Sequence, residues 1–180
     1  MLNYLFNQIE KSKITLIGYS SNGEAYKDEF ISKLPVYKLS NFDIDSFSSI
    51  KSFIRDQKID FVLNVGDLTF DKNAYILIDI NDIKKDEVGI LSIGRKIKNI
   101  LTSALQSDLN ILITSPTYIG AFDNINFSGG HAPLYMSSLS ISIDEKVTIV
   151  KNRNDMEGEF DIKLMDLENY TYICNYETSI

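Results

Sequence analysis

The chain has 180 residues, of which 44% are hydrophobic and 24% charged, a composition typical of a globular protein that can fold as one domain without disulfides or metals. Its single cysteine excludes an intramolecular disulfide and a cysteine metal cluster, and its single histidine excludes a histidine cluster. The net charge of −7 argues against broad, non-specific binding to nucleic-acid phosphates, which depends on clustered lysine and arginine.

The first part of the chain alternates short apolar runs with amphipathic stretches. The run over residues 13–18 predicts a buried strand that ends in a glycine turn. The next predicted elements are a helix over 22–33, a short strand over 36–39, a helix after Asp45 and a buried strand over 60–65. The stretch over 69–87 has no clear pattern apart from an extra strand over 75–80.

The rest of the chain holds the clearest helix, predicted over 90–105, and a buried strand over 110–114. A polar, glycine-containing loop is expected over 115–130. Beyond it the period changes to two, and this predicts antiparallel strands over 139–143, 147–151, 160–164 and 170–174. We therefore expect a single α/β domain over residues 1–180, with a mostly parallel sheet flanked by helices and a C-terminal antiparallel β-meander.

This order of elements, together with three local matches, resembles the RecA/DnaB-like ATPase core, whose members include RecA, RadA, KaiC and phage recombinases. The first match is the segment 18–25, between a strand and a helix. The second is the strand that starts at Asp60, a helix and the strand that ends at 114–115. The third is Ser-Gly-Gly-His-Ala at 128–132, then a strand and the segment 150–160. The resemblance covers roughly residues 13–164 and implies a RecA-like P-loop NTPase fold.

A working phosphate loop of this family reads Gly-x-x-x-x-Gly-Lys-Ser/Thr; its lysine reaches the phosphates and its hydroxyl holds magnesium. Gly18 and Gly23 keep the glycine spacing, but Glu24 stands at the lysine position and Ala25 at the hydroxyl position. The carboxylate would repel phosphate by about 4 kcal/mol at about 4 Å and an effective dielectric near 20. The alternative is an ordinary strand-to-helix turn with two glycines. Both interpretations predict no ATP hydrolysis, no catalytic residue, no metal and no cofactor here.

The carboxylates that would complete a nucleotide site are also expected to be missing. Alignment of the 60–65 strand with the metal-holding strand of the family puts Val65 at the aspartate position, with Asp67 two residues further on and Asn64 as a weak substitute. No glutamate that could act as general base is found after Leu39. The resemblance therefore implies a pseudo-ATPase.

Lys151 and Arg153 match a Lys-x-Arg pair on a late strand of DnaB- and RadA-like relatives. In these relatives the pair reaches the γ-phosphate of a neighbouring subunit, like an arginine finger. Alternation along a strand puts both side chains on one face. The resemblance thus implies a trans-acting finger within a homo-oligomer or beside an active RecA/DnaB-like ATPase. The alternative is that both are exposed strand charges, paired with Glu157 or Asp161.

The expected loop over 115–130 corresponds to a segment that contacts single-stranded DNA in recombinases. Its candidate contact residues are three aromatics and two glycines: Tyr118, Phe122, Phe127, Gly129 and Gly130. Aromatic rings stack on bases, but this segment has no lysine or arginine, so charge does not favour DNA. The alternative is that the aromatics pack into the core or an interface.

The main expectation is a catalytically inactive RecA-like paralogue, acting as a non-hydrolysing subunit or accessory factor in DNA recombination or replication. A composition rich in isoleucine, asparagine and lysine fits an AT-rich genome, that of a phage or of a low-GC bacterium. The alternatives are a single-stranded nucleic-acid-binding module, a structural or interaction protein unrelated to nucleic acid, and an enzyme of another class that uses scattered carboxylates: Asp43, Asp45, Asp67 and Asp79. Without a signal peptide or a long apolar run, we expect a cytoplasmic protein with no membrane contact.

Overall fold

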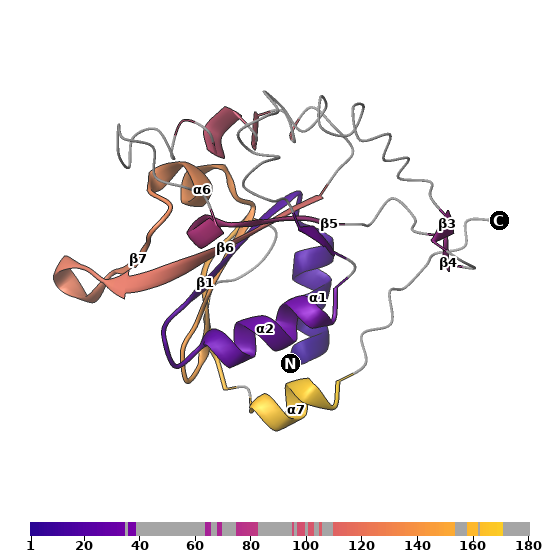
Figure 1. Cartoon of the computed structure of the whole chain (residues 1–180). Helices are drawn as coiled ribbons and strands as arrows, with labels where there is room; N and C mark the ends of the chain where they lie inside the picture. The colour runs from indigo at the N-terminus through magenta and orange to yellow at the C-terminus, as the bar shows by residue number, and fades with distance from the viewer. Residues whose placement is uncertain are drawn as a thin grey trace.

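The computed structural model describes residues 1–34, 36–38, 64–65, 68–69, 75–82, 95, 97–99, 101–102, 105, 110–153, 158–161 and 163–170. These residues form a central β-sheet, and helices pack against it (Figure 1). None of the helices in these ranges has the length and apolar character that crossing a membrane requires.

The body of the sheet consists of parallel strands in the spatial order β8, β1, β6, β5, β2. Their bounds are β1 (Ile14–Tyr19), β2 (Val36–Lys38), β5 (Tyr75–Asp79), β6 (Asn110–Ile119) and β8 (Leu139–Ile143). The remaining strands of this sheet are antiparallel to their neighbours: β9 (Val147–Asn152) on β8, β10 (Gly158–Phe160) on β9 and β7 (Ile125–Phe127) on β6. The predicted α/β class, with a mostly parallel sheet and an antiparallel C-terminal extension, is confirmed.

The central strands are apolar on both faces because side chains pack against both sides of the sheet. Every residue of β1 is buried, and successive side chains alternate, so Leu16 enters one core cluster and Ile17 the other. Three helices contribute to the second cluster: α1 (Leu2–Glu10), α2 (Glu24–Ser32) and α7 (Leu164–Glu168). Helical residues in the clusters include Ile97 and Leu101 in the first, and Leu5, Phe6, Ile9, Phe30 and Leu167 in the second. Complete burial of such a side chain contributes about 1.5–3 kcal/mol.

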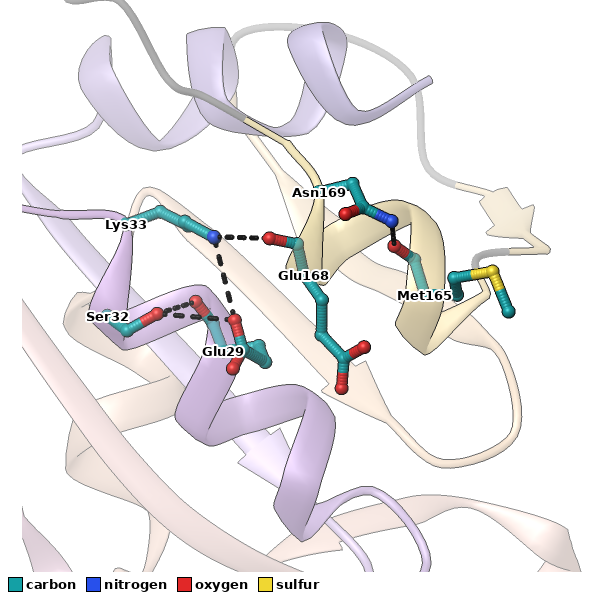
Figure 2. Close-up of polar contacts among 6 residues, drawn as sticks. All are labelled: Glu29, Ser32, Lys33, Met165, Glu168 and Asn169. Atoms are coloured by element: carbon teal, nitrogen blue, oxygen red, sulfur yellow. Dashed lines mark hydrogen bonds and ion pairs between the residues drawn. The ribbon is translucent and has the colours of Figure 1, made fainter.

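A lysine joins α2 to the C-terminal helix α7. Lys33 Nζ donates a hydrogen bond to the Glu168 carbonyl at 2.9 Å and lies 3.7 Å from the Glu29 carboxylate (Figure 2). The last carbonyls of a helix lack partners within the helix, so this ammonium caps α7. The Asn169 side chain caps a second carbonyl, that of Met165, at 2.9 Å. Two short helices of distant sequence position are thereby held together.

The prediction of a core strand over 60–65 is wrong for the residues that the structure describes. Asn64–Val65 (β3) pairs with Leu68–Thr69 (β4) in a separate two-stranded sheet. The core position between β2 and β6 is taken by β5, which corresponds to the extra strand predicted over 75–80. Four consecutive buried residues, Tyr75 to Ile78, explain this, because a strand covered on both faces shows no polar alternation.

Other elements also differ from the predicted ones. No element was predicted before residue 13, yet α1 is there and buries Leu5, Phe6 and Ile9. The strand predicted over 160–164 is replaced by β10, which ends at Phe160, and by α7, which begins at Leu164. Within the helix predicted over 90–105, the described residues 95, 97–99, 101–102 and 105 are helical. The helix after Asp45 lies outside the described residues, as does the strand over 170–174 beyond Tyr170.

Candidate functional site

The carboxyl ends of β1, β5, β6 and β8 lie at one edge of the sheet because these strands run parallel. Ligands of open α/β sheets bind outside this edge, where the strand order reverses. From β1 the chain continues toward β2 on one side and later reaches β8 on the other, so the reversal is at β1. The segment from Ser20 to Gly23, here named the β1 turn, therefore lies where a ligand site is expected.

The β1 turn uses its polar groups internally and on β8. The Gly23 N–H donates to both the carbonyl and the hydroxyl oxygen of Ser20, at 3.1 and 3.2 Å. The Ser20 N–H donates to the Ile143 carbonyl at 3.0 Å, and the Ser20 hydroxyl donates to the Asp144 carboxylate. A phosphate loop needs N–H groups that point at its ligand. Here the Gly23 N–H already has protein acceptors.

Close packing accounts for both glycines next to this turn. A Cβ atom at Gly18 would lie 2.4 Å from side-chain atoms of Phe127 and Thr117. A Cβ atom at Gly23 would lie 2.0 Å from the carbonyl oxygen of Ile143. Neither glycine has a positive φ, so both are needed for space and not for backbone conformation. The spacing of these two glycines is thus explained without a ligand.

Glu24 and Ala25 are both exposed, and Glu24 begins α2. A carboxylate in the first turn of a helix is favoured by the partial positive charge of the helix N-terminus. At the same place it opposes binding of an anion. The two positions that the sequence analysis singled out thus form a polar surface with a negative charge and no hydroxyl.

A buried tyrosine crosses from the end of β1 to the segment after β5. Tyr19 Oη accepts a hydrogen bond from Asn81 Nδ2 at 2.8 Å, and Asn81 belongs to the short helix η1 (Ile80–Asp82). Since β6 lies between β1 and β5, this contact, here named the Tyr19 bridge, passes over β6. The ammonium of Lys27 lies 4.5 Å from the centre of the tyrosine ring and 2.8 Å from the Asp28 carboxylate. Protein side chains therefore occupy this part of the edge.

Sequence reasoning missed the roles of Lys27 and Asp79. Lys27 precedes the buried Phe30 by three residues, and that spacing already placed it on the face of α2 that packs inward. In the sequence Asp79 is one of several scattered carboxylates, because the predicted core strand ends at Val65. With β5 in the core, Asp79 ends a parallel strand, and its Oδ1 accepts the Asn81 N–H at 3.0 Å. Asp43, Asp45 and Asp67 lie outside the described residues.

Lys151 lies on β9 and Arg153 follows directly after it, since β9 ends at Asn152; both side chains contact the end of α6 (His131–Met136). Lys151 Nζ donates to the carbonyls of Leu134 and Tyr135, at 2.6 and 2.9 Å. Arg153 Nη2 donates to the same Tyr135 carbonyl at 3.0 Å. Desolvation by burial, and then the charge of Arg153, lower the pKa of Lys151 below its usual 10.5. Of the predicted acidic partners, Asp161 is 3.9 Å from Lys146 instead, and Glu157 lies outside the described residues.

The segment expected to be a loop over 115–130 is instead a β-hairpin. β6 continues to Ile119, the short helix η2 (Ala121–Asp123) forms the tip, and β7 returns along β6. This hairpin projects from the body of the sheet (Figure 1). The side chain of Phe122 is 95% exposed at the tip, where its φ is 62°, and Tyr118 is 57% exposed. The β-propensity of Ile119, Ile125 and Phe127 explains why this segment pairs.

The other predicted residues of this segment have structural positions. Phe127 is only 5% exposed and belongs to the first core cluster, so for this aromatic the core interpretation is correct. The N–H of Gly129 donates to Ser115 Oγ at 3.3 Å, and a Cβ there would lie 2.9 Å from Ile80. Gly130 has a φ of 80° and precedes α6, a conformation that favours glycine. The glycine pair therefore shapes the turn between β7 and α6.

Among the described residues, no group of three or more His, Cys, Asp or Glu side chains is arranged to hold a metal ion. The search against models of known protein families and the search among characterised proteins both returned no match for this chain. The site is therefore interpreted from its geometry alone. That geometry joins the β1 turn, Tyr19, Asn81 and Asp79 at the sheet edge and leaves Lys151 and Arg153 with α6.

Proposed function

We propose that the chain is a RecA-like core that does not hydrolyse ATP and acts as a non-hydrolysing subunit or accessory factor in DNA recombination or replication. The observation that carries this proposal is the β1 turn, which follows a central parallel strand and begins a helix as a phosphate loop does. Its Gly23 N–H is bonded to Ser20 within the turn, and Glu24 and Ala25 stand where an ammonium and a hydroxyl are needed.

Electrostatics support the loss of nucleotide binding. A carboxylate about 4 Å from a phosphate oxygen opposes binding by about 4 kcal/mol at an effective dielectric near 20. The loss of a lysine from the same place removes a comparable attraction. Asp79 keeps a carboxylate at a strand end, but a metal there would lack both the hydroxyl and the phosphates that normally share it.

Arg153 is better placed than Lys151 to reach into the active site of a partner subunit. Lys151 is half-buried and bonded to two carbonyls of α6. Arg153 is exposed, and its contact with Tyr135 uses one of the five N–H donors of a guanidinium. Arg153 is therefore the residue we propose for the trans-acting finger, with Lys151 as the group that positions the end of its strand.

Affinity purification from the native host tests the proposal, with the ATP turnover of the recovered complex as the readout. We expect a RecA- or DnaB-like ATPase in the complex, and Arg153→Ala should lower its turnover at least tenfold, since fingers contribute that much or more. Lys163→Ala, at an exposed position ahead of α7, is the matched control. Unchanged turnover in an intact Arg153→Ala complex would refute the finger. Recovery of complexes without any such ATPase would refute the proposed function.

A second candidate function, single-stranded nucleic-acid binding, is favoured by the exposure of Phe122 and Tyr118 on a projecting hairpin. Stacking of a base on an aromatic ring contributes about 1–3 kcal/mol. The segment 115–130 lacks lysine and arginine, so we expect retardation of single-stranded DNA only at low salt, and a loss with Phe122→Ala. A gel shift at two salt concentrations decides: no retardation at low salt excludes this candidate.

A further inference from the structure

A pocket of about 310 Å³ opens at the carboxyl edge, beside the hairpin, and Ser20 of the β1 turn is among its lining residues. This volume is at the small end of the roughly 300–1,000 Å³ of ligand pockets. One wall comes from the hairpin and includes Tyr118, Ile119 and Ile125. The opposite wall comes from the turn between β8 and β9 and from β10. We name it the hairpin pocket.

The wall opposite the hairpin is rich in carboxylates. Asp144, Glu145 and Glu159 line the pocket, against a single lining ammonium, that of Lys146. Lys146 Nζ lies 3.9 Å from both Glu159 Oε2 and Asp161 Oδ1, so its charge is already shared between two acids. Net negative charge therefore remains at the mouth of the pocket, and it favours a cationic ligand.

The hairpin wall offers apolar contact. Ile119 is 67% exposed and pairs with Ile125 of β7, so these two side chains lie on the same face of the hairpin, and both residues line the pocket. A metal ion fits this site poorly, since no described group of three acidic or histidine side chains could ligate it. A nucleic-acid phosphate would meet carboxylates on one wall and no lysine or arginine on the other. What fits both walls is a cation carried on an apolar stem and flanked by apolar residues.

We propose that the hairpin pocket binds an arginine or lysine side chain of a partner protein, with neighbouring apolar residues of that partner packed on Ile119 and Ile125. The cation meets Glu145 and Glu159. Ser20 of the β1 turn also lines this pocket, but the proposal does not require that the turn has lost an ATPase activity, so either proposal can fail without the other.

An NMR titration of the full chain with two peptides tests the charge requirement. The probes are acetyl-Leu-Arg-Leu-amide and the same peptide with citrulline, the neutral isostere of arginine. We expect the arginine peptide to shift the amide signals of residues 117–119 and 142–146 in a saturable way. The citrulline peptide should bind several-fold more weakly, and added salt should reduce that difference. Equal affinity for the two peptides, or saturable shifts confined to another surface, would overturn the proposal.

Variants separate the two walls. Glu145→Gln combined with Glu159→Gln should weaken the arginine peptide by roughly three- to tenfold and leave the citrulline peptide unchanged. Glu168→Gln, which removes a charge on α7, is the matched control and should change neither. Ile119→Ser should weaken both peptides alike. An unchanged affinity in the double variant would contradict the proposal.

Other occupants are outcomes of the same experiment. Signals of the pocket that move with a single-stranded oligonucleotide and not with the arginine peptide would assign the site to nucleic acid. Signals that move on dilution without any peptide would assign it to a second copy of the chain. Either result would overturn the proposed recognition of a partner's cationic side chain.

Discussion

The carboxyl edge of the sheet has two sides that differ in how the chain fills them. Between β1 and β5, the Tyr19 bridge passes over β6, and Lys27 lies against the tyrosine ring. Between the hairpin and the turn after β8, a pocket remains. The same edge of one sheet is thus bridged on one side and open on the other.

The difference follows from how far each strand extends. Pairing with β1 ends at Pro116, opposite Tyr19, but β6 continues to Ile119 and pairs with β7 instead. The hairpin thereby leaves the body of the sheet and forms a wall. β5 ends at Asp79, and η1 follows at once, so Asn81 stays within reach of Tyr19. Strand length at this edge decides which side can receive a ligand.

The largest expected effect concerns Gly23, which packs the β1 turn against β8. Gly23→Ala places a Cβ 2.0 Å from the Ile143 carbonyl oxygen, which is backbone and cannot rotate away. We expect the free energy of unfolding to fall by about 3 kcal/mol, the upper range for overpacking. Urea denaturation measures it, with Asn22→Ala, at the exposed neighbouring position, as the control. A loss equal to that of the control would mean that the β1 turn does not rest on β8.

The Tyr19 bridge itself should contribute less. Tyr19→Phe removes the hydroxyl that accepts from Asn81 and should lower the free energy of unfolding by about 1 kcal/mol. A double-mutant cycle with Asn81→Ala isolates the pair, and we expect a coupling energy of about 0.5–1.5 kcal/mol. Additive single effects would show that the two side chains do not hold the bridged side together.

A stabilising change is expected in β1, the strand that both sides share. Thr15 is fully buried, and its hydroxyl has no hydrogen-bond partner among the described residues. Thr15→Val keeps the shape and removes the unsatisfied group, so the free energy of unfolding should rise by about 1 kcal/mol. Thermal and urea denaturation measure this change. A decrease would indicate that the hydroxyl is satisfied in solution.

The smallest expected effect is a pH dependence at Lys151, next to α6. The pKa of Lys151 lies below the 10.5 of a free lysine when the chain is folded, so between the two values the unfolded chain binds more protons. The free energy of unfolding therefore gains a component that rises with pH in this interval. Burial raises the pKa of Tyr170 and gives the opposite sign in the alkaline range.

The difference between the wild type and Lys151→Gln cancels the contribution of Tyr170, because both proteins contain that residue. Urea denaturation at several alkaline pH values gives the slope of the free energy of unfolding against pH. We expect this slope to be less positive, or more negative, for Lys151→Gln than for the wild type. An identical slope in the two proteins would show that Lys151 titrates alike in the folded and unfolded chains.

Sequence patterns predicted the α/β class and the central strands because continuous apolar runs such as residues 14–17 and 111–113 have few other solutions in a folded domain. They misplaced one core strand, since Phe61 to Val65 and Tyr75 to Ile78 are both short, mostly apolar runs with high β-propensity, and propensity alone does not rank them. Only the pairing with β6 separates them, and pairing is a tertiary property.

In the candidate site, too, local sequence identified some residues and missed the contacts that depend on the tertiary fold. Glu24 and Ala25 were singled out by their spacing from Gly18 and Gly23, and they form the first turn of α2. The Tyr19 bridge was not identified, because it joins residues 62 positions apart, and no local pattern encodes that contact. The exposed hairpin was missed because polar residues and Gly120 interrupt its alternation, which therefore resembled a loop.

Direct titration with an ATP analogue tests the central claim that the β1 turn no longer binds nucleotide. The amide signals of residues 19–25 are followed by NMR while magnesium and a non-hydrolysable ATP analogue are added to the full chain. The account predicts no saturable shift of these signals at millimolar nucleotide. A saturable, magnesium-dependent shift centred on Ser20 to Ala25 would contradict it.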